Sequence, residues 1–211
     1  MSDLYVIKKT TLEAIGDIIR EKEKTTDPIL VSEMVERLRA IITNLETIED
    51  ALATNSLTEY SNDRIMYLEG YAFYRRSNLT TINLPAILGI GSYAFYQCIG
   101  LTTVNMPLLR NINAYAFYSC TQLPIVDFPE ASKLAMYAFH GCTVLSTVIL
   151  RRETLVTLDN VNVFTDTPIA SGTGYIYVPS ALVEEYKAAT NWSTYADQIR
   201  AIEDYPDITG G

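Results

Sequence analysis

The stretch YAFYQCIGLTTVNMP, residues 93–107, occurs in related form at three other places in the chain. The copies start at Tyr71, Tyr115 and Tyr137, so neighbouring copies are 22 residues apart (93−71, 115−93 and 137−115). A unit this short cannot bury its own apolar residues, and it becomes stable only by stacking on its neighbours. The sequence therefore predicts a mainly β solenoid with a 22-residue period.

Residues at the same place in successive repeats form columns, and several columns are apolar throughout. Stacked coils bring like residues together, so these columns should form the core. They are Ala72, Ala94, Ala116 and Ala138; Phe73, Phe95, Phe117 and Phe139; Leu79, Leu101, Leu123 and Leu145; Ile82, Val104, Val126 and Val148; Leu84, Met106, Phe128 and Leu150; and, on the return limb, Ile90, Ile112 and Leu134. Pro85, Pro107 and Pro129 end the short strands, because proline has no N–H to donate.

Composition and charge exclude several classes of protein. With 48% hydrophobic and 19% charged residues, the 211-residue chain is expected to fold around a sizeable core. The net charge of −9 argues against nucleic acid as a partner, because phosphate binding needs clustered lysine and arginine. No apolar run approaches the roughly 18–20 residues of a membrane span, and MSDLYVIKKTT lacks the order of a signal peptide.

The three cysteines, Cys98, Cys120 and Cys142, share one column. Stacked strands would place them about 4.8 Å apart with nearly parallel Cβ directions, which does not favour a disulfide. A metal site is disfavoured because its ligands must converge, and the fourth member of the column is Arg76. Buried free thiols are expected, with disulfide and metal ligation as the alternatives. No cofactor is expected either.

Residues 1–42 differ in kind from the repeats and are expected to form a helical hairpin. Thr10 and Glu13 form a capping box before a helix over about 11–22, and Ser32 caps a second helix after Pro28. Such a hairpin is too small to be stable alone, so its apolar faces should also contact a partner. The faces carry Leu12, Ile15 and Ile19 in the first helix, and Met34, Val35, Leu38, Ile41 and Ile42 in the second.

The rest of the chain divides around the repeats. Residues 43–70 are expected to be a linker and N-terminal cap, with Leu68 already in the Ile90 column. The solenoid follows over 71–165, and its last coil is irregular because Phe164 comes 25 residues after Phe139 (164−139).

A C-terminal β/α cap is expected over 166–203, because a solenoid needs its end covered. Gly172 and Gly174 predict a turn and Tyr175 to Val178 a strand. One predicted helix has Leu182, Tyr186 and Ala189 on one face, and a second helical stripe has Trp192, Tyr195 and Ile199. Residues 204–211 are expected to be a flexible tail.

The candidate chemistry is sparse, and no enzyme is predicted. The single histidine, His140, occupies the column otherwise filled by Tyr74, Tyr96 and Tyr118. No serine, cysteine or carboxylate is placed by the sequence to form a triad with it. Asp127, Asp159 and Asp166 lack the spacing of a calcium loop.

Two surfaces are candidates for binding. The tyrosine columns beside the buried Ala-Phe pair could bind sugars or a protein, or they could simply be stacked β-surface residues. The face made by the parallel strands is the second candidate, since solenoids commonly bind there, and Ile125 and Ile149 make its late end more apolar. Alternatively, the C-terminal segment covers Ile149. The two strand columns are Thr81, Thr103, Ile125 and Thr147, and Asn83, Asn105, Asp127 and Ile149.

The column order I-x-x-x-A-F-x-x-C-x-x-L-x-x-I-x-L-P resembles the BspA-like leucine-rich repeat family over about residues 60–165, although Arg76 replaces cysteine in the first repeat. The resemblance implies a right-handed solenoid used for binding and adhesion rather than catalysis. TLEAIGDIIREKEKTTDPILVSEMVERLRAI resembles a helical hairpin near the start of structural proteins of tailed bacteriophages and prophages. TPIASGTGYIYVPSALVEEYKAATNWSTYADQIRAI resembles the cap that follows such repeats in the same phage proteins.

Together these resemblances imply a structural component of a tailed-phage virion, in a tail fibre, baseplate or head surface. It would be made in the host cytoplasm without a signal peptide and then be part of the virion. Other virion proteins would bind residues 1–42, and the solenoid would bind a host-surface glycan or protein. A homo-oligomer or symmetric multi-copy attachment is the default. The alternatives are a bacterial cell-surface or secreted BspA-like adhesin, then an intracellular protein-binding module.

Overall fold

The computed structural model describes residues 56–209 of the chain. The predicted hairpin over 1–42, including Leu12, Ile15, Ile19, Val35, Leu38 and Ile41, lies outside the described residues, as does the first part of the 43–70 segment. The chain divides into two compact units, 1–57 and 58–211. The repeats belong to the second unit.

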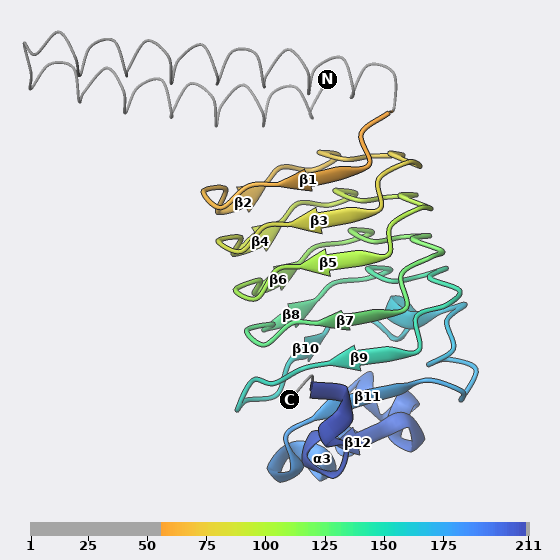
Figure 1. Ribbon diagram of the computed structural model, residues 1–211. Coiled ribbons are helices and arrows are strands. Elements are labelled where there is room, and N and C mark those ends of the chain that lie inside the picture. Colours follow the sequence, from red (N-terminus) through yellow and green to blue (C-terminus); the bar gives the residue numbers. More distant parts are fainter. Residues whose placement is uncertain (1–55, 210–211) are drawn as a thin grey trace, which may run out of the picture. The chain divides into compact units, whose positions relative to one another are not determined.

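Three-residue parallel strands recur once per repeat and form one face of a solenoid (Figure 1). Thr81 pairs with Thr103 and Ile125 with Thr147, which is the predicted 22-residue step. We call this surface the strand face. Its strands are β1 (Glu59–Ser61), β3 (Thr81–Asn83) and β5 (Thr103–Asn105) in one sheet, and β7 (Ile125–Asp127), β9 (Thr147–Ile149), β11 (Tyr175–Val178) and β12 (Ile199–Ala201) in another.

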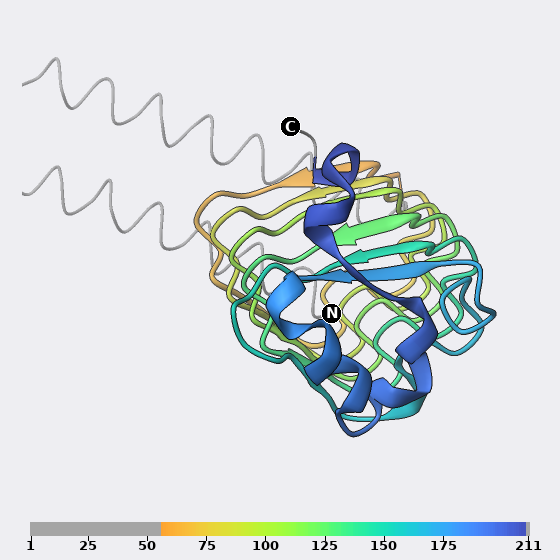
Figure 2. The same ribbon diagram turned by 90° about the horizontal axis from the view of Figure 1, so that it is seen from below.

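A third parallel sheet runs along the stack with two-residue strands, and Figure 2 shows the successive coils nearly superimposed. Its order is β10-β8-β6-β4-β2. The strands are β2 (Tyr67–Leu68), β4 (Gly89–Ile90), β6 (Asn111–Ile112), β8 (Lys133–Leu134) and β10 (Thr157–Leu158). Because β1 and β2 pair in register with the next coil, residues 58–70 already form a coil of the solenoid.

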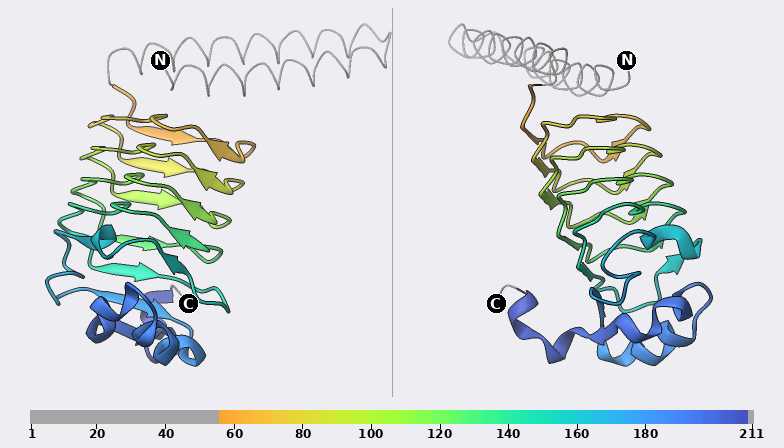
Figure 3. Two further views of the ribbon diagram at one scale, coloured as in Figure 1. Left: turned by 180° about the vertical axis from the view of Figure 1, so that it is seen from behind. Right: turned by 90° about the vertical axis from the view of Figure 1, so that its right-hand side faces the viewer.

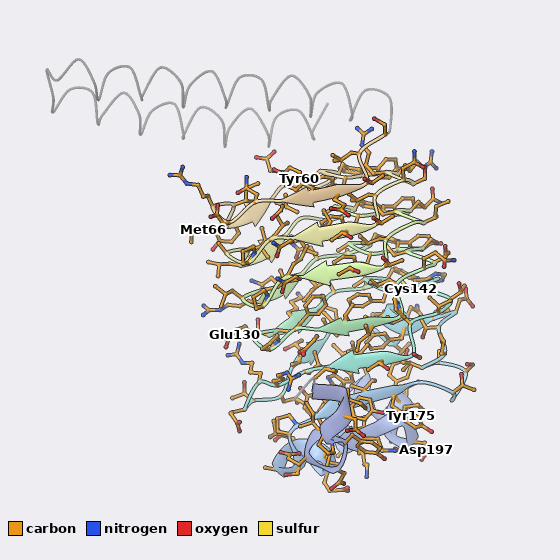
Figure 4. The ribbon with its side chains drawn as sticks, in the orientation of Figure 1. Tyr60, Met66, Glu130, Cys142, Tyr175 and Asp197 are labelled. Atoms are coloured by element: carbon orange, nitrogen blue, oxygen red, sulfur yellow. The ribbon has the colours of Figure 1, made fainter. Side chains whose placement is uncertain are left out.

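The predicted apolar columns fill the interior between these sheets (Figure 4). The phenylalanine rings stack from coil to coil with centroids 5.1–5.3 Å apart between Phe73 and Phe139. Phe164 continues the column at 5.9 Å from Phe139, so the three extra residues of the last coil are accommodated outside the core. Tyr60 occupies the place of Ile82 in the first coil and packs on Phe73.

The cysteines are free and buried, as predicted. Each thiol donates a hydrogen bond to a phenylalanine carbonyl of the preceding coil: Cys98 to Phe73 at 3.0 Å, Cys120 to Phe95 at 3.2 Å and Cys142 to Phe117 at 3.0 Å. Burial, followed by the neighbouring Cys142 thiol, raises the pKa of Cys120 well above its ordinary value. The protonated thiol is therefore the form that the core requires, because only it can donate.

The turn between each two-residue strand and the strand face has a left-handed residue at two places in each repeat. Tyr71, Tyr93, Tyr115 and Tyr137 have φ of 57–65°, and Arg75, Gln97, Ser119 and Gly141 have φ of 55–74°. In this turn alternate N–H groups donate to the next coil: that of Phe73 donates to Ala94 O and that of Arg75 to Tyr96 O, both at 2.7 Å. Left-handed residues thus extend the inter-coil ladder into the turn.

The strand face is interrupted between β5 and β7, which belong to different sheets and are not hydrogen-bonded to each other (Figure 1). Pro124 precedes β7 at the place where Thr80, Thr102 and Ser146 each donate an N–H to the preceding coil, and proline has none to give. Val104, predicted to be a core residue, is consequently half-buried, whereas Ile82 and Val126 in its column are buried.

The C-terminal segment lies at the end of the stack (Figure 3). The predicted strand is β11, which pairs with β9, and the preceding turn contains Gly172 with φ of 84°. Ile199 was expected in a helix but lies in β12, because it pairs with Ile176 of β11. The helical elements are η1 (Val161–Phe164), η2 (Ser180–Leu182), α3 (Val183–Ala188), η3 (Trp192–Gln198), η4 (Ile202–Asp204) and η5 (Pro206–Thr209), so Leu182 and Ala189 flank the predicted helix rather than lie within it.

Aromatic side chains attach this segment to the last coils. The Trp192 ring nitrogen donates to Val156 O at 2.7 Å, and the Val156 N–H donates to the Tyr186 hydroxyl at 3.1 Å. Tyr195 donates its hydroxyl to Val161 O. Trp192 and Tyr195 also contact the Phe164 ring that ends the core column.

The described part of the predicted tail, residues 204–209, packs against the C-terminal segment. Residues 204–209 follow η4 into η5, with Tyr205 packed edge-on against Tyr177 at 5.1 Å. Ile208 packs on a cluster of Ile149, Tyr177 and Ile202. This packing leaves Ile149 only 1% exposed, so it is covered, which was the alternative to its forming a contact patch. Within residues 56–209, no helix combines the length and apolarity needed to cross a membrane.

Candidate functional site

Two columns of aromatic rings run side by side along the turns of the solenoid. Neighbouring rings within a column have centroids 4.7–5.1 Å apart and planes 3–20° from parallel. Rings of the two columns within one coil lie 5.5–5.8 Å apart. We call this surface the tyrosine strip. It consists of Tyr71, Tyr93, Tyr115 and Tyr137 in the first column, and Tyr74, Tyr96, Tyr118 and His140 in the second.

Stacking decides which parts of the rings are accessible. Within each column the ring faces cover one another, so the ring edges and hydroxyls are the parts that can face solvent. The Tyr137 hydroxyl also accepts a hydrogen bond from the Asn162 amide at 3.3 Å. Tyr71 is 49% exposed, and the other members of the strip are half-buried. The hydroxyls of Tyr93 and Tyr96 lie at the surface. Their pKa values are raised, first by partial desolvation and then by the neighbouring tyrosines.

The first column holds tyrosine at positions where the backbone is left-handed. A non-glycine residue in the left-handed region costs roughly 1–2 kcal/mol, and an aromatic pair returns about 0.5–1.5 kcal/mol beyond its buried area. A middle ring such as Tyr93 makes three such pairs, with Tyr71, Tyr96 and Tyr115, so ring contacts offset the strain that glycine would avoid. The first column therefore combines a left-handed backbone, at φ of 57–65°, with a continuous stack of rings.

His140 extends the second column. Its ring stacks on Tyr118 with centroids 4.8 Å apart and lies tilted against Tyr137 at 5.6 Å. Nε2 lies 3.7 Å from the Asp166 carboxylate, and Nδ1 is enclosed without a hydrogen-bond partner. A histidine held in this way replaces a tyrosine in the stack, which fits the interpretation of a column variant.

The strand face carries a short ladder of polar side chains. The Asn83 amide donates to Ser61 Oγ at 2.9 Å, and the Asn105 amide donates to Asn83 Oδ1 at 2.7 Å. In the next coil, Asp127 instead accepts two-pronged hydrogen bonds from Arg151, the closest at 2.6 Å. The ladder thus ends at the interruption between β5 and β7.

The predicted site residues therefore form two surfaces. Tyr74, Tyr96 and Tyr118 come together in the tyrosine strip, where they are joined by the first tyrosine column. On the strand face, Thr103 and Asn105 are exposed, Thr81 and Asn83 are half-buried, and Ile125 is 42% exposed beside Asp127. Among residues 56–209, no three histidine, cysteine or acidic side chains are arranged to hold a metal ion.

Both surfaces are built from a repeat that is found in other proteins. Residues 42–178 match, in six copies, the family described as the BspA type leucine rich repeat region. The chain belongs to this family. A search of curated proteins found no match.

Three solved structures are similar to this BspA-type chain. A leucine-rich repeat protein of T. pallidum (TpLRR) is 22% identical, with a TM-score of 0.49, and the alignment covers 58% of each chain. A leucine rich cell surface protein of Faecalibacterium prausnitzii is 20% identical, with a TM-score of 0.42, and coverage is 54% of this chain and 36% of that one. The pneumococcal vaccine antigen PcpA is 15% identical, with a TM-score of 0.50, and coverage is 68% and 41%. The present chain thus spans less than two thirds of each of these proteins.

Proposed function

We propose that this BspA-type protein is a non-enzymatic adhesion or recognition protein that makes its contact through the surface of the solenoid. The observation that supports this proposal best is the tyrosine strip. Its first column keeps a strained backbone to display aromatic residues, and strain retained at a repeated position is a pointer to function. The strand face, through Thr103, Asn105 and Ile125, is the second contact surface.

Binding of the purified chain to bacterial and animal cells tests this function. The labelled wild-type chain is expected to bind at least one cell type saturably. Tyr96→Ala with Tyr118→Ala removes two stacked rings, and Thr103→Lys with Asn105→Lys alters the strand face. Glu184→Ala, on the exposed side of α3, is the matched control. Loss of binding in either double variant, but not in the control, assigns the surface. Absence of saturable binding to every cell type would contradict the function.

Where the protein is displayed is a separate part of the proposal. The two candidates are a bacterial cell, as a surface or secreted adhesin, and a virion. Membership of the BspA-type family supports a bacterial cell-surface or secreted adhesin. The resemblance of residues 1–42 to a phage hairpin supports a virion component that other virion proteins bind through Leu12, Ile15, Ile19, Val35, Leu38 and Ile41. In a virion, symmetric attachment of several copies is expected.

Fractionation distinguishes the cell-surface adhesin from the virion component. Mass spectrometry of purified particles is expected to find the chain if it belongs to a virion, whereas recovery from the envelope of a particle-free culture favours the adhesin. Deleting residues 1–42 should then abolish incorporation into particles and leave the circular-dichroism spectrum of the solenoid intact. Normal incorporation of the shortened chain would reject attachment through the hairpin.

A further inference from the structure

The tyrosine strip is periodic along the stack of coils. Along each column the rings repeat every 4.7–5.1 Å over four coils, and the two columns lie 5.5–5.8 Å apart. Each tyrosine adds a hydroxyl, which can both donate and accept a hydrogen bond. The first three coils of the strip therefore each offer the same pair of groups to a ligand, and the fourth offers Tyr137 beside His140.

The stacking determines how a ligand can contact this surface. Because ring faces within a column cover one another, a single sugar or a single side chain cannot lie flat on a ring in the middle of the strip. What remains is the row of ring edges and hydroxyls. Each such contact is weak in water, so useful affinity needs several at once. A ligand that repeats along the strip can supply them, whereas a compact molecule cannot.

The positions beside the rings are mostly small and uncharged. Ser92 and Ala114 precede the rings of the two middle coils, and Gln97 and Ser119 follow them. Charge lies at the flanks of the strip: the Arg75 guanidinium lies over the Tyr74 ring at 5.2 Å and donates to Gln97 Oε1 at 2.8 Å, and His140 faces Asp166. The strip therefore offers no row of cations to a polyanion. A neutral ligand could bind with little desolvation of charged side chains.

We infer that the tyrosine strip binds a neutral, extended polysaccharide, with about one sugar in each coil. This inference rests on the proposed function, because it names the ligand of that contact surface. In an extended β-1,4-linked chain the sugars follow one another at a spacing similar to that of the coils. Sugar hydroxyls, like those of tyrosine, both donate and accept, so the two rows can pair along their length.

Titration calorimetry of the full chain with cellobiose and cellohexaose tests the inference. Cellohexaose is expected to bind at least about tenfold more tightly, because it reaches several coils. Changing Tyr93, Tyr96, Tyr115 and Tyr118 together to phenylalanine keeps the stacked rings and removes the hydroxyls. Each lost hydroxyl should weaken binding about two- to tenfold. The matched control is Tyr175→Phe with Tyr205→Phe, which removes two hydroxyls from residues that are 37% and 38% exposed outside the strip; Tyr175 is labelled in Figure 4.

The outcomes separate this inference from the function beneath it. Unchanged affinity in the fourfold phenylalanine variant overturns the inference, as does equal affinity for the two glucans. If cells bind the chain but cellohexaose, xylan and mannan do not, the inference fails and the proposed function stands. Cell binding that protease treatment of the cells abolishes would instead identify a protein ligand. Heparin serves as the charged comparison, and tighter binding to it than to cellohexaose would also overturn the inference.

Discussion

Ser119 and Gly141 occupy the same place in successive coils, with φ of 55° and 74°. Ser119→Gly should raise the free energy of unfolding by about 0.5 kcal/mol, because the relief of left-handed strain outweighs the added freedom of the unfolded chain. Gly141→Ala should lower it by about 1–2 kcal/mol, since the new Cβ would also lie 2.9 Å from Ser119 Oγ. Urea unfolding of both variants measures the two changes. Equal signs would show that backbone strain does not control this position.

Tyr186 makes the stability of the protein fall as pH rises in the alkaline range. Burial raises the pKa of this tyrosine from 10.0 to about 12, although the Val156 N–H at its hydroxyl opposes the shift. A raised folded pKa means that the folded state holds the proton more tightly, so its contribution is complete below pH 10 and is lost as pH rises through 12.

Tyr186→Phe tests this in the alkaline range. At pH 8 it should lower the free energy of unfolding by about 1–3 kcal/mol, because the buried Val156 N–H loses its acceptor. Above pH 10, stability should fall less steeply with pH than in the wild type. Urea unfolding at pH 8, 10 and 11 measures both effects, with Tyr205→Phe as the exposed control. Parallel pH dependence in wild type and variant would contradict the assignment to Tyr186.

At the scale of elements, the interruption of the strand face should be visible in amide exchange. By the register of the other coils, the N–H groups of Ile125 and Asp127 point towards β5, to which β7 is not hydrogen-bonded. They should exchange much faster than those of Thr103 and Asn105, which face β3. Hydrogen exchange followed by NMR measures this. Pro124→Thr, which restores the residue type of Thr80 and Thr102, should slow both amides, and equal protection in the wild type would show that the ladder is continuous.

The elements that the sequence predicts well are those set by a repeated residue. The phenylalanine, leucine and cysteine columns are buried as expected, because every coil makes the same demand on the same position. Val104 is more exposed than the rest of its column because of Pro124 in the next coil. Pro124 belongs to a different column, so the column of Val104 alone could not predict this. Ile199 looks like part of a helical stripe with Tyr195, yet it pairs with Ile176, a distant partner that no local period specifies.

Candidate sites follow the same rule. The columns placed Tyr74, Tyr96 and Tyr118 on one line, and the structure shows them stacked. The sequence did not predict that the faces of these rings stack on one another, because stacking depends on side-chain angles rather than on spacing. The left-handed backbone of the first tyrosine column was likewise hidden, because glycine, the usual sign of it, does not occur there.

At the scale of the whole solenoid, the free energy of local unfolding should differ from coil to coil along the stack. Each coil contacts only its neighbours, so unfolding can begin wherever an end is weakest. The C-terminal end is closed by Trp192, which is 1% exposed, donates to Val156 O at 2.7 Å and packs against Tyr186 and Phe164.

Trp192→Ala should therefore act on the C-terminal coils more than on the others. Loss of the ring and its hydrogen bond should lower stability there by about 3–5 kcal/mol. Amides of β9 and β11 should lose protection, while those of β3 and β5 keep theirs, because β5 and β7 are not hydrogen-bonded. Residue-resolved hydrogen exchange of the wild type and the variant measures the gradient. A uniform loss over all coils would show instead that the solenoid unfolds as one cooperative unit across its interruption.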